Sequence, residues 1–222
     1  MILVQERVQA SDITLTGKFS FLSNRNSYYE YETLNLDLEI KRKVEYGFSA
    51  VELKKILSEI TVACSYLESL NTRHGDLRPE FIFRNEDIPS QPVYRLMDNV
   101  RDPSGKGAIN CFKRGVDKFM SPLLYRAFCL NNTKVKHDRV LSDVFSLGLI
   151  ILQAGIGAKV QTCYDRTVGR VRSTILDKCI VEFKEKYKTD QLLCDSVAQM
   201  VSISESSRPY FSTLKEKLAP NA

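Results

Sequence analysis

The residues best suited to bind a metal or to carry redox chemistry are six cysteines and two histidines. They are Cys64, Cys111, Cys129, Cys163, Cys179, Cys194, His74 and His137. No two cysteines form a C-x-x-C pair, and none stands at ligand spacing from a histidine, so a zinc site is not expected. The pattern indicates reduced thiols in an intracellular protein, cytoplasmic in the first instance, with an organelle left open as the alternative.

Five short segments carry the remaining residues of chemical interest. In chain order they are residues 74–81 (HGDLRPEF), 95–100 (RLMDNV), 119–123 (FMSPL), 142–148 (SDVFSLG) and 208–211 (RPYF). Each segment alone is a weak signal. Together, in this order and at this spacing, they resemble the H-R-D catalytic loop, the D-F-G strand, the A-P-E region, the D-V-W-S-L-G helix and the R-P segment of protein kinases.

This resemblance to the protein-kinase family extends from about residue 12 to residue 218 and implies a fold. The expected class is α+β, mainly α: a kinase-like C-lobe with a two-stranded remnant of the N-lobe. Residues 1–34 would form the partial N-lobe and residues 35–222 the helical C-lobe. The two parts would make one degenerate kinase-like domain, a truncated pseudokinase.

The catalytic loop keeps some of the family's functional residues and has lost others. The resemblance places Asp76 at the catalytic-base position and Arg78 where the family has a lysine near the transferred phosphate. Asp98 stands at the position of a metal-binding carboxylate. Phe81 occupies the position of the asparagine that holds metal, and a phenyl ring cannot ligate a cation that demands oxygen. The remnant is therefore expected to hold a metal ion poorly.

The other motifs are degenerate as well. Asn99 and Val100 replace the last two residues of D-F-G, so the glycine of that turn is absent. Leu123 replaces the glutamate of A-P-E, which would leave Arg208 without its usual carboxylate partner. Gly75 stands where the family has the arginine that binds an activation-loop phosphate. The family's phosphorylation switch is therefore not expected.

Three retained residues have a structural explanation that needs no catalysis. In the family, the histidine of the catalytic loop and the aspartate of the D-V-W-S-L-G helix brace the loop by hydrogen bonds. The resemblance assigns these roles to His74 and Asp143. We expect this bracing rather than residual activity to explain why His74, Asp76 and Asp143 are present.

In a kinase, the nucleotide-binding elements lie N-terminal to the part of the domain that this chain resembles. They are a Gly-rich loop, a lysine on the third strand and a glutamate of the first helix, which position the phosphates and stabilise their charge. The sequence contains no G-x-G-x-x-G segment. It begins close to residues 13–22, which resemble the fourth strand of the kinase N-lobe. We therefore expect no phosphotransferase activity, no cofactor and no resident metal.

Strand-like segments precede helical ones along the chain. Residues 13–22 and 27–33 are rich in β-branched and aromatic residues and flank a turn signal, which predicts a hairpin. Residues 34–47 are polar, and the resemblance makes residues 34–43 the hinge between the lobes.

The pattern then changes to that of helices. Ser49 and Glu52 form a capping box before a long amphipathic helix that ends near residue 70. Residues 101–141 are expected to be irregular, and an apolar helix follows over residues 141–154. Three more helices are expected, over residues 171–187, 192–201 and 211–218.

The partial N-lobe predicts a surface that needs a partner. The second strand would normally pair with a strand that the remnant lacks, and an open strand edge invites pairing with another chain. Its aromatic residues Tyr28, Tyr29 and Tyr31 would add area typical of interfaces. We expect other protein subunits to cover this face; the alternative is that residues 1–12 fold back over the edge.

Composition limits the remaining choices. The 222 residues are 43% hydrophobic and 27% charged, which suits one fairly large folded domain. The most apolar stretch, residues 144–154, is too short to span a membrane. The net charge is +5 with dispersed basic residues, so nucleic acid is not the expected partner.

Three functions remain open at this point. The first is a catalytically inactive scaffold inside a multiprotein assembly. The second is an atypical nucleotide-binding or weakly active kinase-like enzyme. The third is a basic surface that binds a polyanion, which steep salt dependence would reveal.

Overall fold

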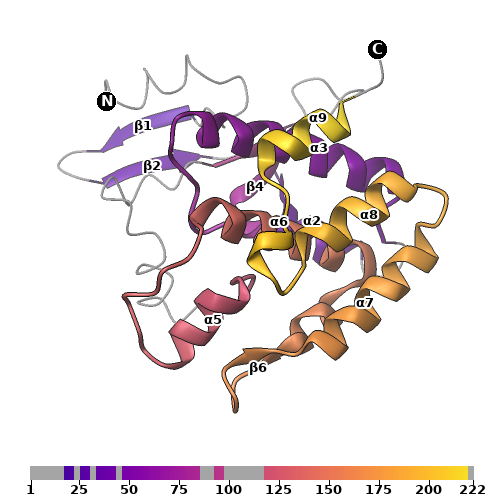
Figure 1. The fold of residues 1–222 in the computed structure, drawn as a ribbon. Helices are drawn as coiled ribbons and strands as arrows, with labels where there is room; N and C mark the ends of the chain where they lie inside the picture. The colour runs from indigo at the N-terminus through magenta and orange to yellow at the C-terminus, as the bar shows by residue number, and fades with distance from the viewer. Residues whose placement is uncertain are drawn as a thin grey trace.

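Helices form most of the described structure, together with three small antiparallel sheets (Figure 1). The computed structural model describes residues 18–22, 26–30, 34–43, 47–85, 93–97 and 118–219. The fold is α+β and mainly helical, with the arrangement of a kinase-like C-lobe and a separate two-stranded hairpin, as the sequence predicted.

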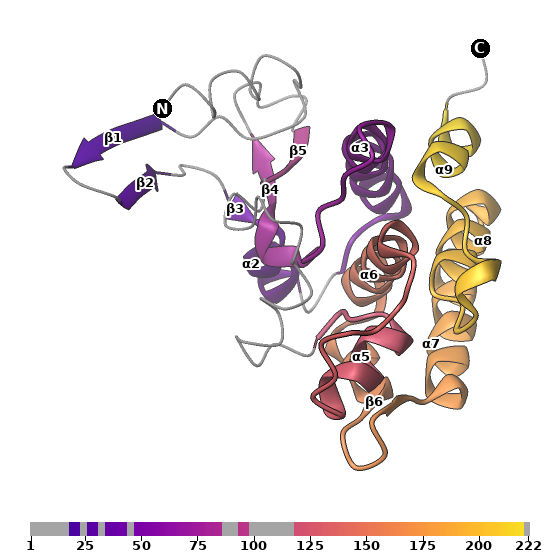
Figure 2. The ribbon, with the colours of Figure 1, turned by 60° about the vertical axis from the view of Figure 1, so that its left-hand side comes forward.

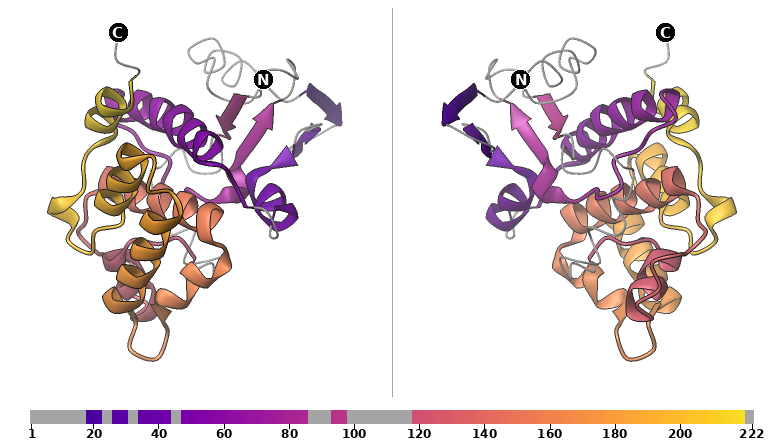
Figure 3. Two further views of the ribbon diagram at one scale, coloured as in Figure 1. Left: turned by 90° about the vertical axis from the view of Figure 1, so that its right-hand side faces the viewer. Right: turned by 90° about the vertical axis from the view of Figure 1, so that its left-hand side faces the viewer.

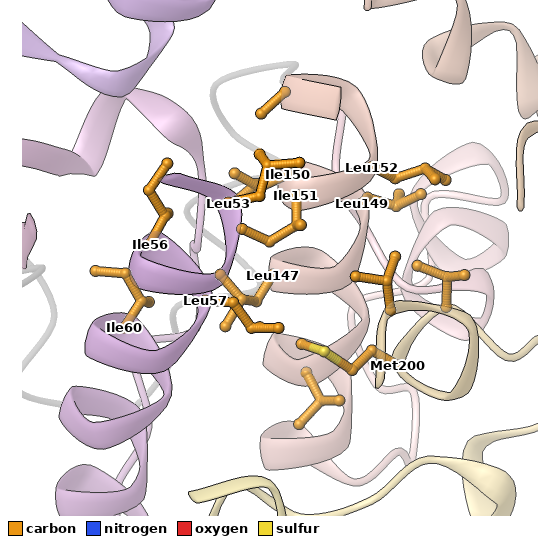
Figure 4. Close-up of a cluster of buried hydrophobic side chains, with 14 of the residues drawn as sticks. Leu53, Ile56, Leu57, Ile60, Leu147, Leu149, Ile150, Ile151, Leu152 and Met200 are labelled. Atoms are coloured by element: carbon orange, nitrogen blue, oxygen red, sulfur yellow. The ribbon is translucent and has the colours of Figure 1, made fainter. Parts of the chain in front are cut away.

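Helix α3 (Ala50–Ser69) begins at the predicted capping box. The Ser49 hydroxyl accepts a hydrogen bond from the N–H of Glu52, and the Glu52 carboxylate accepts one from the N–H of Ser49. In Figure 4, Leu53 and Leu57 of α3 point toward Ile150 and Ile151 of the facing helix. Ile56 and Ile60 lie on the other side of α3, and all four α3 side chains are fully buried.

Helix α6 (Arg139–Ile156) runs through the middle of the core. Its N-cap Asp138 accepts hydrogen bonds from the N–H groups of Val140 and Leu141, at 2.9 and 3.0 Å. The helix is long and apolar enough to cross a membrane by length and composition alone, but 83% of it is buried inside the fold. That burial is typical of a core helix in a helical domain.

The remaining helices surround α6 (Figure 1). They are α2 (Leu36–Arg42), α5 (Pro122–Cys129), α7 (Ser173–Lys186), α8 (Gln191–Met200) and α9 (Phe211–Leu218), with 3-10 turns η1 (Pro79–Phe81), η2 (Ala158–Cys163) and η3 (Glu205–Ser207). Two glycines let α7 and α8 approach α6 closely. A Cβ on Gly155 would lie 2.5 Å from the Phe183 ring, and one on Gly148 would lie 2.8 Å from Met200. Close packing of α6 therefore depends on residues without side chains.

The sheets are short, and each is antiparallel. Strands β1 (Lys18–Leu22) and β2 (Asn26–Glu30) form a hairpin with Lys18 opposite Glu30. Strands β3 (Leu34–Asn35), β4 (Ile82–Asn85) and β5 (Val93–Leu96) form the second sheet, and β6 (Tyr164–Asp165) and β7 (Arg170–Val171) the third. Figure 2 shows β1 and β2 standing apart from the helical body, with β3, β4 and β5 between them and α3.

Figure 3 shows the same division of the molecule from two opposite sides. The two N-terminal sheets lie on one side, and α7, α8 and α9 lie on the other. The expected boundary after residue 34 falls within β3, and this strand pairs with β4 of the helical lobe.

Three local expectations were wrong. The expected hinge contains helix α2, because Asn35 accepts a hydrogen bond from the N–H of Leu38 and caps a helix with acidic residues in its first turn. The expected irregular region contains α5, which begins at Pro122. Val171 lies in β7 opposite Tyr164 rather than in α7, because this strand pairing ends just before the helix begins.

Candidate functional site

The segment that resembles a catalytic loop leaves α3 and leads into η1 and β4. Its backbone is held by Asp143 of α6, whose carboxylate accepts hydrogen bonds from the N–H groups of His74 (3.0 Å) and Gly75 (3.0 and 3.1 Å). Gly75 has φ 78°, a left-handed conformation that glycine adopts without strain. Burial raises the pKa of Asp143, while the nearby His74 and the two N–H donors oppose that rise.

The His74 ring connects this loop to strand β5. Its Nδ1 accepts a hydrogen bond from the N–H of Asp76 at 3.3 Å, which places the ring proton on Nε2. The Nε2–H then donates to the carbonyl oxygen of Met97 at 2.9 Å. His74 thereby fixes the loop to the residue that precedes Asp98. The sequence predicted a bracing role for this histidine but not the atoms that it contacts.

Asp76 and Arg78 lie against each other inside the loop. The Arg78 Nε is 2.8 Å from Oδ1 of Asp76, and an Arg78 Nη is 3.1 Å from Oδ2. Each carboxylate oxygen therefore lies close to one guanidinium nitrogen: the Nη donates a hydrogen bond to Oδ2, and the Nε contact with Oδ1 is an ion pair without hydrogen-bond geometry. Asp76 is buried, and only 12% of the Arg78 side chain is exposed.

The Phe81 ring covers this ion pair. The Arg78 guanidinium carbon lies 4.6 Å from the centre of the Phe81 ring, within the range of a cation–π contact. The centre of the Phe81 ring is also 5.8 Å from the centre of the His74 ring, to which it is tilted by 51°. Phe81 thus packs against the side chains of Arg78 and His74, and its phenyl ring offers no oxygen to a cation.

The resemblance to kinases implies a metal–nucleotide group beside this loop, and two described residues, Phe81 and Arg78, fit it poorly. Phe81 offers no ligand atom at the position where a kinase has an amide oxygen, and hard cations need oxygen ligands. Arg78 is bonded to Asp76 rather than turned toward an incoming phosphate. Asp98, the second residue expected at a metal position, lies outside the described residues, as do Asn99 and Val100.

Arg208 and Leu123 lie in separate environments. Arg208 is buried and donates to the carbonyl oxygens of Ser202 (2.8 Å), Leu141 (3.1 Å) and Ile203 (3.1 Å). Burial lowers the pKa of Arg208 to about 10. Leu123 lies on α5 and is 40% exposed. Backbone carbonyls therefore surround the Arg208 guanidinium in the described structure.

The tyrosines of the expected partner edge are only partly described. Tyr28 and Tyr29 lie in β2, opposite Ser20 and Phe19 of β1. Tyr31 lies outside the described residues. Their proposed role at an interface stays a prediction.

A buried polar cluster beside the loop was missed by the sequence analysis. The Glu39 carboxylate on α2 accepts a hydrogen bond from an Arg84 Nη at 2.9 Å and from the Tyr94 hydroxyl at 3.2 Å. Burial is the main cause that raises the pKa of Tyr94, and the charge of Glu39 adds to it. Glu39 is 45 and 55 residues from its partners, so no local pattern could have found them. The local pattern, with Asn35 as the N-cap, could have indicated only helix α2, which carries Glu39.

Comparison with solved structures identifies the fold. No protein-family model matches the chain, and no curated protein sequence matches it. The kinase domain of Mycobacterium tuberculosis PknI matches in structure with a TM-score of 0.55 and 9% sequence identity, over 86% of this chain and 64% of that one. The chain has a protein-kinase-like fold.

A double mutant of the same PknI kinase domain gives a similar result. Its TM-score is 0.53 at 9% identity, over 87% of this chain and 66% of that one. The chain therefore spans about two thirds of the length of these kinase domains. At this identity the similarity concerns the fold alone.

Proposed function

We propose that this chain is a catalytically inactive kinase-like protein that acts as a structural or scaffolding subunit of a multiprotein assembly. One observation carries the proposal: the Phe81 ring, at the position where the resemblance expects a metal ligand, lies over the guanidinium of the Asp76–Arg78 ion pair. A phosphotransferase needs metal ions and positioned charge around the transferred phosphate. Phe81 supplies neither.

The geometry of Asp76 supports the same proposal. A catalytic base must lie within hydrogen-bond reach of the hydroxyl whose proton it takes. Both oxygens of Asp76 face Arg78, at 2.8 and 3.1 Å, so Asp76 would first have to release this guanidinium before it could reach a substrate hydroxyl. The bonds of Asp143 to the loop backbone explain the retained residues as parts of the fold.

A weakly active or atypical nucleotide-binding enzyme is the second candidate. The observation that favours it is the loop backbone itself, since Asp143 and His74 hold Asp76 at the end of α3 as a kinase scaffold would. In this case Arg78 would turn from Asp76 toward a phosphate when nucleotide binds. The two candidates differ in whether Mg-ATP stabilises the fold.

Thermal unfolding with and without Mg-ATP tests the two candidates. A ligand at a hundred times its Kd stabilises a protein by about 2.7 kcal/mol, which shifts the unfolding temperature by several degrees. We expect no shift for the wild-type chain at millimolar Mg-ATP and no phosphate transfer to a generic substrate protein. A shift of several degrees in the wild type would overturn the inactive scaffold.

Two substitutions sharpen that test. Phe81→Asn restores an amide oxygen, and Phe81→Leu is its control, since it removes the ring without adding a ligand atom. A Mg-ATP shift that appears only in Phe81→Asn would identify Phe81 as the cause of the loss. Asp76→Asn should leave assembly with partners intact in cells, provided that circular dichroism shows the variant to be folded.

The β1–β2 hairpin supports the partner side of the proposal. The two strands pair only with each other among the described residues, and a two-stranded hairpin is marginal in water without further packing. Another subunit that adds a strand or covers a face would stabilise it. Crosslinking mass spectrometry in cells tests this: crosslinks from residues 18–30 to another protein are expected, and a hairpin free of them would contradict the role.

A further inference from the structure

Helix α5 and the β6–β7 hairpin are joined into one unit at the end of the lobe. The rings of Tyr125 and Tyr164 meet edge to face at 4.7 Å, and the Tyr164 hydroxyl donates to the Met120 carbonyl at 2.6 Å. A Cβ on Gly169 would lie 2.9 Å from the Cβ of Cys129, so the hairpin turn touches the end of α5. Figures 1 and 2 both show α5 and β6 side by side at the lower end of the molecule.

This unit exposes large aliphatic side chains around that contact. Leu130 is 66% exposed and Val168 is 61% exposed, and each is the chain neighbour of one of the touching residues, Cys129 and Gly169. Leu123, in the first turn of α5, is 40% exposed, and Leu130 is the residue that caps the end of this helix. Clustered exposure of this kind is typical of a contact surface.

The same unit concentrates positive charge. We define the basic end as residues 118–136 and 158–172, which carry eight basic residues and one acidic residue, Asp165. Asp165 is already bonded to Arg172, at 2.8 Å from its Nε. The whole chain has a net charge of only +5, so the rest of the chain is slightly acidic. Lys159 is likewise paired with Glu182 of α7, whereas Arg126 of α5 and Arg170 of β7 expose their side chains.

We propose that the basic end is a docking surface for an acidic protein segment that carries aliphatic side chains. Leu123, Leu130 and Val168 would receive the apolar side chains, and the surrounding arginines would pair with carboxylates. Arginine beside apolar groups is enriched at protein interfaces, and complementary charge fixes the partner and speeds association. The inference rests on the scaffold role proposed above and names a surface and a partner class for it.

The side chains of the basic end favour a protein over a nucleic acid or a membrane. Single-stranded nucleic acids stack on exposed aromatic rings, whereas the four aromatic residues of the basic end, Phe119, Tyr125, Phe128 and Tyr164, are buried or half-buried. A membrane-lying amphipathic helix turns its whole apolar face to the lipid, whereas α5 buries its Tyr125 and Ala127 inside the fold. The exposed apolar groups are two leucines and a valine among arginines.

A defined peptide probe tests the proposal. The probe is a fluorescein-labelled synthetic peptide of alternating Glu and Leu, and the comparison peptide replaces each Leu by Ser. Fluorescence anisotropy with the full chain should show tighter binding of the Glu/Leu peptide. The Arg126→Glu/Arg170→Glu variant should weaken its binding at least tenfold, and Leu130→Ser/Val168→Ser should weaken it severalfold.

Matched controls separate a local surface from bulk charge. Lys178→Glu/Lys215→Glu makes the same charge change on exposed faces of α7 and α9, and it should alter binding less than twofold. Circular dichroism verifies that each variant is folded. Absence of peptide binding at millimolar concentration, equal loss in the control variant, or equal binding of the Ser peptide would overturn the proposal.

Two further probes decide between partner classes. Tighter binding of single-stranded DNA or of vesicles rich in phosphatidylserine than of the Glu/Leu peptide would also overturn it. These titrations contain no nucleotide triphosphate, so their outcome is independent of the Mg-ATP test. If the chain binds both Mg-ATP and the peptide, the docking-surface proposal stands and only the proposal of an inactive protein is overturned.

Discussion

Both carboxylate oxygens of Asp143 lie at hydrogen-bond distance from the backbone nitrogen of Gly75, at 3.1 and 3.0 Å, although 68 residues separate the two. This contact fixes the shape of the loop that resembles a catalytic loop. The donor is a backbone N–H, so this hydrogen bond holds the loop in the same way whether or not the protein is an enzyme. An inactive descendant of a kinase fold would therefore still need Asp143.

Replacing Asp143 should destabilise the protein whatever its activity. Asp143→Ala removes the acceptor for the N–H groups of His74 and Gly75, and buried unsatisfied donors cost about 1–3 kcal/mol each. We expect a loss of about 3 kcal/mol in the free energy of unfolding, measured by urea denaturation. Asp177→Ala on the exposed face of α7 is the control and should cost less than about 0.5 kcal/mol.

Stability should fall in alkaline solution because of Tyr187. Burial raises the pKa of Tyr187 from 10.0 to about 12. Between these values the folded protein keeps a proton that the unfolded chain has lost, so the free energy of unfolding falls as pH rises, by up to about 1.4 kcal/mol per pH unit. Urea denaturation at pH 8, 10 and 11 measures this slope.

Tyr187→Phe identifies the group that causes the slope. At pH 8 the variant should be about 1 kcal/mol less stable, because the hydroxyl contacts the carbonyl oxygens of Phe48 (2.8 Å) and Gly155 (3.1 Å). Without the phenol the variant loses stability more slowly above pH 10, so the difference from wild type should shrink. A difference that stays constant with pH would contradict the assignment.

Adding one methyl group to helix α6 should disrupt its packing against α7. The Cβ of Gly155→Ala would lie 2.5 Å from Cε2 of Phe183, so the ring must move, and overpacking of this kind costs about 1–3 kcal/mol. Phe183→Leu in the same chain makes room and should recover part of the loss. Urea denaturation of both single variants and the double variant gives the coupling, and additive losses would show that the contact is not the cause.

The buried cluster around Glu39 should be coupled more strongly than a surface pair. Glu39→Leu leaves the Arg84 guanidinium without its 2.9 Å partner, and breaking a buried pair from one side costs about 3–5 kcal/mol. Arg84→Met added to Glu39→Leu should recover much of this loss in a double-mutant cycle. Lys41→Ala removes an exposed pair with Asp37 on the same helix and should hardly move the denaturation midpoint. Equal effects of the buried and the exposed substitutions would contradict the role of the cluster.

Local sequence patterns predicted most of the helices. The Ser49–Glu52 capping box and the apolar spacing behind it gave α3 its start and its buried face, because both signals act within one or two turns. The five motif-like segments also predicted the kinase-like fold. Helix α2 was missed although its signal is local, since Asn35 caps it and acidic residues precede basic ones along it.

The candidate site was predicted by position but not by contact. The sequence placed Asp76, Arg78 and Phe81 together in one loop, and it identified Phe81 as unable to bind a cation. It did not predict that Arg78 turns back onto Asp76 with the Phe81 ring over it. Rotamers within a loop depend on the surfaces around it, and here those surfaces come from His74 and the distant helix α6.

The sequence by itself determined helix α3, the buried helix α6 and the presence of a phenyl ring without a ligand atom at Phe81, because each depends on residue type or on short-range periodicity. Only the tertiary structure decided that Glu39 meets Arg84 and that Leu130 and Val168 share one exposed end. These contacts join residues tens of positions apart. They form only when the packed core brings their helices and strands together, which no local pattern encodes.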